Sequence, residues 1–238
     1  MGFPVTIRGD GTGTPLEESW LNDAFGFQQA LLSIAALTPS GIPDTAENSQ
    51  YLDAAKIILG AVAKSVSELA DTGAIVEKQK AFLIDGGRSA AFAATLTDIS
   101  TEVTGDPLQG VYVAFASDPT GASGGWVRVD TTTLTIQMFG ALDGVDCSAE
   151  FQSAVDHCSS LGAKLLIFGA GLTYATGVTI PRLATPSVVG NGQDVSIISY
   201  TGSGAAIAWD ESIDNISDRF GWGGFSLDCS GSTADYGL

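Results

Sequence analysis

The stretch 139–181 constrains the fold most, because it places one short helix directly before two short strands. The apolar side chains of the helix recur at the 3.6-residue period of an amphipathic helix: Phe151, Ala154, Val155 and Cys158. Asp143-Gly144 forms a turn before it, Gly162 stops it, and Ser148 is the expected N-cap. The apolar run 165–168 then predicts a strand buried on both faces.

Short apolar strands separated by glycine turns continue beyond this stretch. They are predicted at 187–189, 196–198, 205–208 and 225–227. We interpret Leu166, Val188, Ile207 and Phe225 as equivalent positions of successive coils, because steps of about twenty residues are typical of solenoid proteins. The second half of the sequence therefore predicts a repeating parallel β structure.

The N-terminal region is predicted to be helical. Thr14-Pro15 and Glu17 form a capping box with proline at the first helical position, and Pro39 ends this helix. A second helix carries apolar residues at alternating steps of three and four: Leu52, Ala55, Leu59, Val62, Val66 and Leu69. This heptad pattern favours self-association of identical helices, and the alternative is an amphipathic helix packed on its own domain.

Residues 82–138 have a β pattern. The segments 110–115 and 126–129 are strand-like, and the turn sequence DPTGASGG connects them. We expect a small β module here, which acts as a spacer, as a second anchor domain, or as the outermost part of a cap on the following coils.

The composition excludes several functions. Acidic residues outnumber basic ones by 27 to 10, and the net charge of −17 argues against a nucleic-acid or anionic-membrane partner. No segment has the length of a signal peptide core or a membrane helix, so no membrane insertion is expected. Three unevenly spaced cysteines predict neither a disulfide framework nor a zinc site, and no cofactor or metal motif is present.

Several motifs in the second half resemble a known family. F-G-A and D-G, the helix A-E-F-Q-S-A-V-D, G-x-G-x-T-Y and V-T-I-P, in this order, resemble the opening of pectate-lyase-like right-handed β-helices, which are common in bacteriophage tailspikes. In that family the helix covers the N-terminal end of the coil stack, which would otherwise expose a core and strand edges.

The N-terminal region carries a second resemblance. G-T-G-T-P-L-E-E-S-W-L-N-D, followed by T-P-S-G-x-P-D and N-S-Q-Y-L-D-A, is similar to the segment that attaches phage tail fibres and tailspikes to the virion. Together the resemblances imply a structural component of the virion tail that is made in the host cytoplasm. They imply a homotrimer that docks on a tail, adaptor or baseplate protein and binds a host surface polysaccharide through a downstream region.

The expected fold is therefore mixed, with three regions in a trimeric chain. Residues 1–81 form a helical virion-attachment and trimerisation region, 82–138 the small β module, and 139–238 the cap helix and first coils of a right-handed parallel β-helix. Coils that stopped at Leu238 would expose a strand edge, so we expect this chain to be the front part of a longer polypeptide.

The candidate site residues fall into two groups. A virion or trimer interface is predicted at the apolar helix positions Trp20, Leu21, Phe25, Leu52, Leu59, Val62, Val66 and Leu69. Glycan contacts are predicted in an acidic and aromatic loop at Asp210, Asp214 and Trp222.

The sequence contains no recognisable pair of catalytic carboxylates. Asp143 and Asp146 are interpreted as turn and helix-start residues, and the only histidine, His157, as a solvated helix residue. Whether the whole protein is an enzyme stays open, and any glycan-degrading activity would lie beyond residue 238.

Two alternative functions remain. A stand-alone β-helix polysaccharide lyase or glycoside hydrolase would be expected to carry a signal peptide and a carboxylate or basic site. A bacterial adhesin would also need an export signal, and it gives no reason for the heptad pattern.

Overall fold

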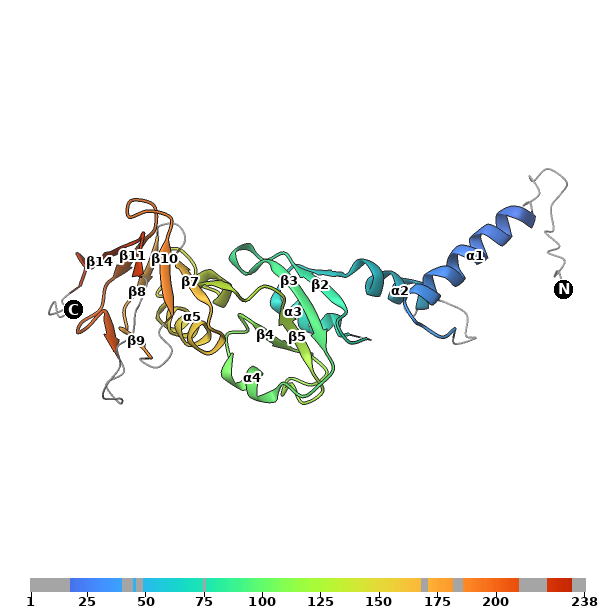
Figure 1. The fold of residues 1–238 in the computed structure, drawn as a ribbon, viewed down its shortest axis with the longest axis horizontal. Helices are drawn as coiled ribbons and strands as arrows, with labels where there is room; N and C mark the ends of the chain where they lie inside the picture. The colour runs from blue at the N-terminus through green and yellow to red at the C-terminus, as the bar shows by residue number, and fades with distance from the viewer. Residues whose placement is uncertain are drawn as a thin grey trace. The chain divides into compact units, whose positions relative to one another are not determined.

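The computed structural model describes residues 18–39, 45, 49–74, 76–167, 171–181, 186–209 and 222–232. The chain divides into two compact units at Gly60 (Figure 1). We call residues 1–60 the helical unit, residues 61–128 the sheet module, and residues 133–228 the parallel-strand region; the last two belong to one compact unit.

The helical unit consists of α1 (Glu18–Ile34) and α2 (Gln50–Leu59). The start predicted at Thr14 lies outside the described residues, and α1 ends before Pro39. The Ser49 hydroxyl caps α2 by accepting a hydrogen bond from the Leu52 backbone N–H at 3.2 Å. The buried core between the two helices consists of Leu32, Ala35 and Ala54.

The single heptad helix predicted from Leu52 to Leu69 is wrong. α2 ends at Leu59 because Gly60 takes a φ of 83°, which terminates the helix. The chain then forms β1 (Ala61–Ala63) and a separate helix, α3 (Val66–Thr72). Ser65 starts α3, since its hydroxyl accepts from the Glu68 N–H at 3.1 Å and the Glu68 carboxylate accepts from the Lys64 N–H at 2.7 Å.

The sheet module contains a five-stranded sheet with the order β1-β2-β3-β5-β4. The remaining elements of the module are β2 (Lys80–Leu83), η1 (Gly86–Arg88), β3 (Ala90–Thr95), α4 (Ser100–Gly105), β4 (Tyr112–Ala114) and β5 (Gly125–Arg128). β1 pairs with β2 in parallel, and the other pairs are antiparallel. The sheet thus begins at Ala61, and the boundary predicted between residues 81 and 82 falls inside β2.

One face of this sheet packs against α3 and forms the core of the module. Trp126 and Phe92 are fully buried in it, and Trp126 meets Phe115 edge-on with ring centroids 5.8 Å apart. Val66 and Leu69 of α3 belong to the same core. They are therefore not available for a seam between helices of different chains.

The parallel-strand region begins at β6, before the cap helix. Its elements are β6 (Thr133–Thr135), η2 (Ile136–Phe139), α5 (Ser148–Leu161), β7 (Lys164–Ile167), β8 (Leu172–Tyr174), β9 (Val178–Ile180), β10 (Ser187–Gly190), β11 (Ile197–Tyr200), β12 (Ile207–Trp209), β13 (Trp222–Gly223) and β14 (Ser226–Asp228). The strands that the structure describes here form three small parallel sheets, ordered β13-β10-β7-β6, β14-β11-β8 and β12-β9. From β7 onward, the chain visits the three sheets in the same order on every pass.

The register corrects the predicted equivalence of Leu166, Val188, Ile207 and Phe225. Val188 pairs with Leu165 and with Trp222, in one sheet. Ile207 lies in a different sheet and pairs with Val178. The regular spacing was misleading because each pass has three strands of similar apolar character, and spacing alone does not tell which sheet a strand joins.

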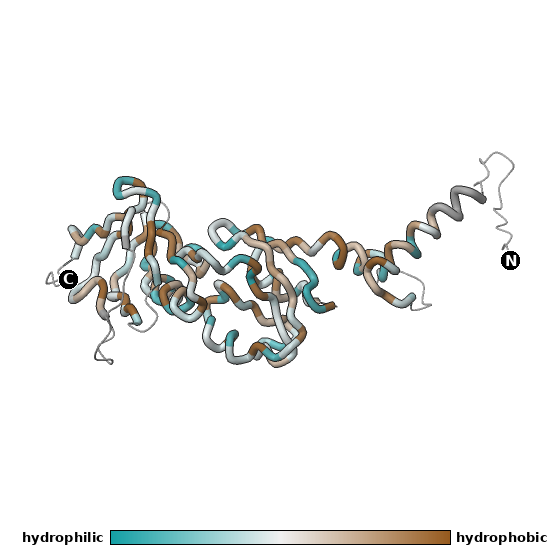
Figure 2. The backbone as a smooth tube through the Cα atoms, viewed as in Figure 1, coloured by the Kyte–Doolittle hydropathy of each residue, from teal (hydrophilic) through white to brown (hydrophobic). Residues whose placement is uncertain are grey.

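The cap helix α5 buries the stripe predicted for it. Phe151, Ala154, Val155 and Cys158 all lie in the core of the parallel-strand region, and Figure 2 shows hydrophobic segments running through its strands. The core continues along the strands as a series of rings, with centroids 5.2 Å apart between Phe151 and Tyr174. The predicted N-cap is wrong, because Ser148 is the first helical residue. Its hydroxyl instead accepts from the backbone N–H groups of Ala175 and Thr176, at 3.0 and 2.9 Å.

Two arginines lie where the sheet module meets the start of the parallel-strand region, Arg128 buried and Arg88 partly buried. Arg128 Nε donates to the carbonyl of Gly110 at 2.7 Å, and Arg88 Nη2 donates to the carbonyls of Leu108 and Phe139, the latter at 3.0 Å. Burial, with a smaller contribution from nearby Arg88, lowers the pKa of Arg128 to about 10. Both cations are thus held by backbone carbonyls of segments that are distant in sequence.

A buried carboxylate organises the same junction. Asp106 accepts hydrogen bonds from the N–H groups of Gly110, Val111 and Tyr112 at 3.1, 2.7 and 2.9 Å. These bonds shape the loop so that Val111 enters the core of the parallel-strand region. The sheet module therefore contributes a buried side chain to that core.

His157 also lies at this junction and is buried, so its predicted solvated position is wrong. Its Nδ1–H donates to the Ser153 carbonyl at 2.9 Å, and its ring lies 5.1 Å from that of Phe139. Its Nε2 is 3.8 Å from a carboxylate oxygen of Asp106. The sheet module covers a side of α5 that the sequence pattern treats as solvent-facing.

We expect Leu69→Ala to lower the free energy of unfolding by about 2 to 5 kcal/mol, because it leaves a cavity in the core of the sheet module. The matched variant Leu142→Ala removes the same atoms from an exposed position in the parallel-strand region and should cost less than about 1 kcal/mol. Denaturant unfolding of both variants measures the difference. Equal losses would contradict the assignment of Leu69 to the core.

The thiols provide a second test of the packing. Burial raises the pKa of Cys147 to about 11 and that of Cys158 to about 12, which suppresses the reactive thiolate. Cys229 is partly exposed. We expect a thiol-specific chromogenic reagent at pH 8 to label Cys229 in the folded chain, and Cys147 and Cys158 only after denaturation. Rapid labelling of all three thiols without denaturant would contradict the buried cap.

Candidate protein interface

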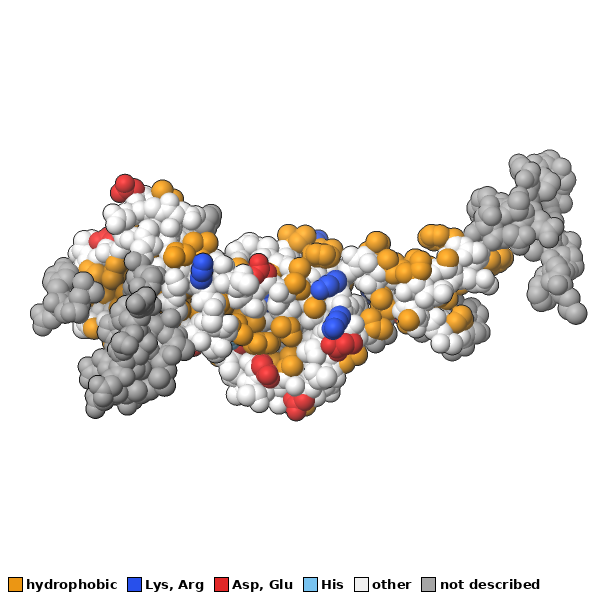
Figure 3. Space-filling model, in the orientation of Figure 1, with side chains coloured by type: hydrophobic (Ala, Val, Ile, Leu, Met, Phe, Trp, Pro, Cys, Tyr) orange, Lys and Arg blue, Asp and Glu red, His pale blue; other side chains and the backbone are white. Residues whose placement is uncertain are grey.

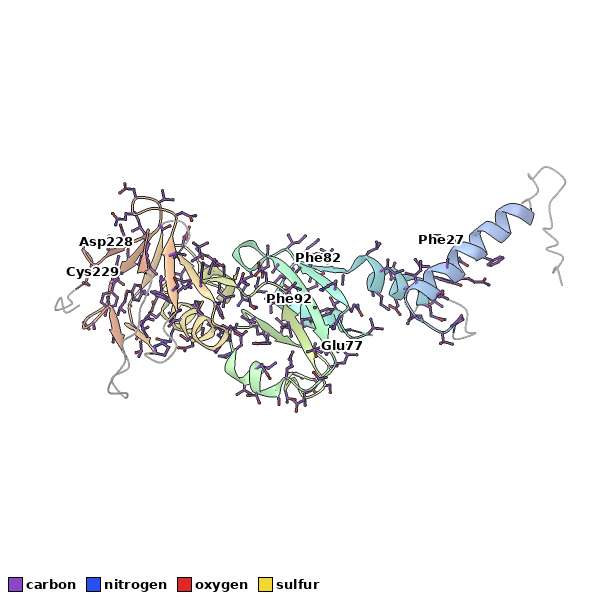
Figure 4. All side chains as sticks on the ribbon, in the orientation of Figure 1. Phe27, Glu77, Phe82, Phe92, Asp228 and Cys229 are labelled. Carbon is purple, nitrogen blue, oxygen red and sulfur yellow. The ribbon has the colours of Figure 1, made fainter. Side chains whose placement is uncertain are left out.

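The helical unit exposes large apolar side chains on both of its helices. They are Phe25, Phe27 and Ile34 on α1, and Leu52, Ile58 and Leu59 on α2. Phe27 is 68% exposed and Leu59 75% exposed, and Figure 4 shows Phe27 on α1. Exposed apolar groups of this size, gathered on one small unit, make these helices the candidate protein-binding surface of the chain.

The small core of the helical unit strengthens this interpretation. Its fully buried side chains, within the described part of the unit, are Leu32, Ala35 and Ala54. Two helices with so little buried apolar surface gain too little free energy to offset the conformational entropy that folding costs. The described part of this unit therefore buries little apolar surface within the chain itself.

The charge pattern favours an apolar partner surface. From Ala24 to the end of α1 the helix has no charged residue. On α2, Lys56 and Asp53 form an exposed ion pair at 3.7 Å, which contributes little stability. The part of α1 from Ala24 to Ile34 is thus uncharged, although the chain as a whole is strongly acidic.

The predicted interface residues are distributed over several environments. Phe25, Leu52 and Leu59 are exposed on the helices, while Val62 is exposed on strand β1. Val66 and Leu69 are buried in the sheet module. Trp20 and Leu21 belong to α1, but their side chains lie outside the described residues.

The sequence prediction missed Phe27, Ile34 and Ile58. They fall off the single apolar stripe that was used to assign a face to each helix. The available signal was that α1 is apolar around much of its circumference, which indicates a helix contacted from more than one side.

The glycan contacts predicted at Asp210 and Asp214 lie outside the described residues. Trp222 belongs to strand β13, but its side chain is also outside them. Among the residues that the structure describes, no cluster of three His, Cys, Asp or Glu side chains could hold a metal ion. Within the same residues, no helix combines the length and apolar character that crossing a membrane requires.

Asp146 has the turn and helix-start role expected for it. One of its oxygens accepts from the Ser148 backbone N–H at 3.1 Å and from the Ala175 N–H at 3.0 Å. The hydrogen bond from the Ser148 hydroxyl is the main cause that lowers the pKa of Asp146. Asp228, labelled in Figure 4, likewise accepts from Ser230 N–H at 2.9 Å, and hydrogen bonding to Ser230 lowers its pKa.

The exposed carboxylate of Asp118 shows the same chemistry most strongly. It accepts from the Thr120 hydroxyl at 2.6 Å and from the Ser123 N–H at 2.8 Å, and these bonds lower its pKa to about 2. A carboxyl whose folded pKa lies below the unfolded value stabilises the fold above the unfolded pKa, here 3.8. This contribution is lost as the pH falls through about 2.

We therefore expect Asp118→Asn to flatten the acid side of the stability profile between about pH 4 and pH 2. Thermal unfolding at a series of pH values measures this profile. Asp71→Asn, which removes an exposed carboxylate from helix α3, is the control and should leave the slope unchanged. A profile of Asp118→Asn that parallels the wild type would contradict the role of this turn.

Comparison with solved structures gives several tailspike proteins of phages. The tailspike of Acinetobacter baumannii phage AM24 matches with a TM-score of 0.51 and 17% identity, over 74% of this chain and 28% of that one. The tailspike of Acinetobacter phage vB_ApiP_P1 matches with a TM-score of 0.49 and 22% identity, over 73% of this chain and 29% of that one. The enzymatically active domain of bacteriophage CBA120 tailspike protein 2 has a TM-score of 0.49 and 19% identity, over 90% of this chain and 30% of that one.

This chain thus spans 28% to 30% of the length of these three tailspikes. No protein-family model matches the chain, and no curated protein is similar to it. Likeness at this level of identity concerns the fold alone. It shows that this mixed α/β chain, with its small parallel sheets, has a tailspike-like fold.

Proposed function

We propose that the chain is the N-terminal part of a homotrimeric bacteriophage tailspike or tail fibre, a structural component of the virion tail. In this proposal the helical unit attaches the trimer to a tail, adaptor or baseplate protein. The exposed apolar side chains of α1 and α2 carry the proposal, because they lie on a unit whose described buried core is very small.

The parallel-strand region is, in the same proposal, the start of a right-handed parallel β-helix. Two observations support this architecture. All described strand pairs in the region are parallel, and successive strands enter the three sheets in a constant order. The cap helix α5 contributes its apolar stripe to the core at the first passes, where an uncovered stack would expose apolar side chains.

Host attachment is assigned to a longer protein of which this chain would be the front part. The matched tailspike of phage AM24 is more than three times as long as the part this chain covers, which supports such a continuation. We propose that the downstream coils bind a host surface polysaccharide. The protein would be made in the host cytoplasm and incorporated into the virion tail.

Light scattering over a range of concentrations tests the trimer. We expect a stable mass near three times 24.3 kDa. The double variant Phe27→Ser/Leu59→Ser should dissociate at least tenfold more readily, because truncating a central apolar contact costs about 2 kcal/mol or more.

The control is Val145→Ser/Val195→Ser, which removes exposed apolar side chains from the parallel-strand region. It should leave the mass unchanged. A wild-type chain that stays monomeric at every concentration would remove the main support for the anchor, while the parallel-strand fold would stand.

A further inference from the structure

The outer face of the five-stranded sheet is open over β1, β2 and β3. Side chains alternate along these strands, so those opposite the α3 side point outward: Val62, Lys80, Phe82, Ala91 and Ala93. Val62 is 57% exposed and Phe82 42%, although they sit side by side on neighbouring strands. Figure 4 labels Phe82 and Phe92, which belong to opposite faces of the sheet.

The apolar character extends beyond the strand ends. Ile84, which follows β2, is 62% exposed, and Val129, which follows β5, is 52% exposed. The Val129 N–H donates to the Ala91 carbonyl at 3.0 Å, so Val129 continues the row that Val62, Phe82 and Ala91 form across the sheet. One apolar row thus crosses the open part of the sheet.

The chain covers the other part of the same face itself. A Cβ added to Gly125 of β5 would lie 2.9 Å from Cδ1 of Ile99, which is buried at the start of α4. Ala114 of β4 is buried as well. The segment around α4 therefore packs over β4 and β5, whereas within residues 61–238 no described segment performs this role over β1 to β3.

The charges on the open face differ in sign from those of the chain. β1, β2 and β3 contain no Asp or Glu, and Lys80 of β2 and Lys64, directly after β1, are exposed. Asp85 and Asp130 follow Ile84 and Val129 at the ends of the row. The whole chain has 27 acidic and 10 basic residues. Figure 3 shows hydrophobic side chains together with basic and acidic ones over the sheet module.

We propose that this apolar face docks on a second copy of the chain within the oligomer. The inference rests on the proposed trimer and adds a surface to it. A copy with a net charge of −17 offers abundant carboxylates to the lysines, while the apolar row is a place where two such acidic chains can approach without like-charge repulsion.

The apolar area of this face is too small to hold an oligomer together by itself. Four partly exposed apolar side chains contribute only a few hundred Å² at most, since even a fully exposed aromatic side chain offers about 150 to 250 Å². A stable interface buries roughly 800 Å² per partner. The face therefore supplements the helical contact, and in a ring of three copies it meets a different surface of its neighbour.

Light scattering of the full 238-residue chain tests the proposal with Phe82→Asp and, as a matched control, Val195→Asp. Val195 is an equally apolar, exposed residue in the parallel-strand region. We expect Phe82→Asp to raise the dissociation constant of the oligomer at least tenfold, and Val195→Asp to leave it unchanged. Circular dichroism and the unfolding midpoint verify that both variants fold.

A second variant addresses the charge. Lys80→Glu should weaken assembly and reduce its dependence on salt concentration, because screening acts on the lysine–carboxylate attraction that this variant removes. If the wild type assembles and Phe82→Asp assembles equally well, no copy docks on this face, and only this inference is overturned. If the wild type is monomeric at every concentration, both the proposed trimer and this inference are contradicted.

Discussion

A stack of parallel strands exposes its core at the first pass unless other elements cover it. The rest of this fold depends on that cover. α5 brings Phe151, Ala154 and Val155 into the core from one side. Val111 reaches the same core from the sheet module. The first passes are thus covered by two elements that lie on opposite sides of β6 in the sequence.

The closure is held by polar groups that the fold removes from water. Burying a carboxylate or a guanidinium is costly unless hydrogen bonds replace those of the solvent. Asp106 receives three backbone N–H bonds, and Arg128 donates to the Gly110 and Arg88 carbonyls within the sheet module. Arg88 donates to the Phe139 carbonyl across the junction. Because these partners are backbone groups of particular loops, the network fixes the loop conformations as well as the contact.

The sequence predicted the local elements better than their assembly. The apolar stripe of α5 and its glycine stop at Gly162 were predicted because a helix records its buried face in its own periodicity. The heptad from Leu52 to Leu69 failed because apolar steps of three and four also arise where a helix, a strand and a second helix follow one another. Gly60 ends α2 and Ser65 caps the start of α3, so the two residues that interrupt the pattern stand in the sequence itself.

The sequence pattern did not predict which side chains are buried by contacts between distant segments. The burial of His157 depends on Phe139 and on the sheet module, both supplied by other segments. For the candidate interface, exposed positions such as Leu52 and Leu59 were found from the helix pattern, whereas Phe27 and Phe82 were not. Whether an apolar side chain is exposed depends on which other segments pack against it. The sequence pattern of a single helix or strand does not give that information.

The constant order in which strands enter the three sheets has an evolutionary consequence. β10 pairs only with β7 and β13, and β11 only with β8 and β14, so each described pass hydrogen-bonds to the passes directly before and after it. Inserting or deleting a whole pass further along would leave the contacts of α5 and of the arginine junction intact. Selection can therefore lengthen, shorten or exchange the distal part of such a protein by recombination, while the segment that closes the first pass is inherited unchanged.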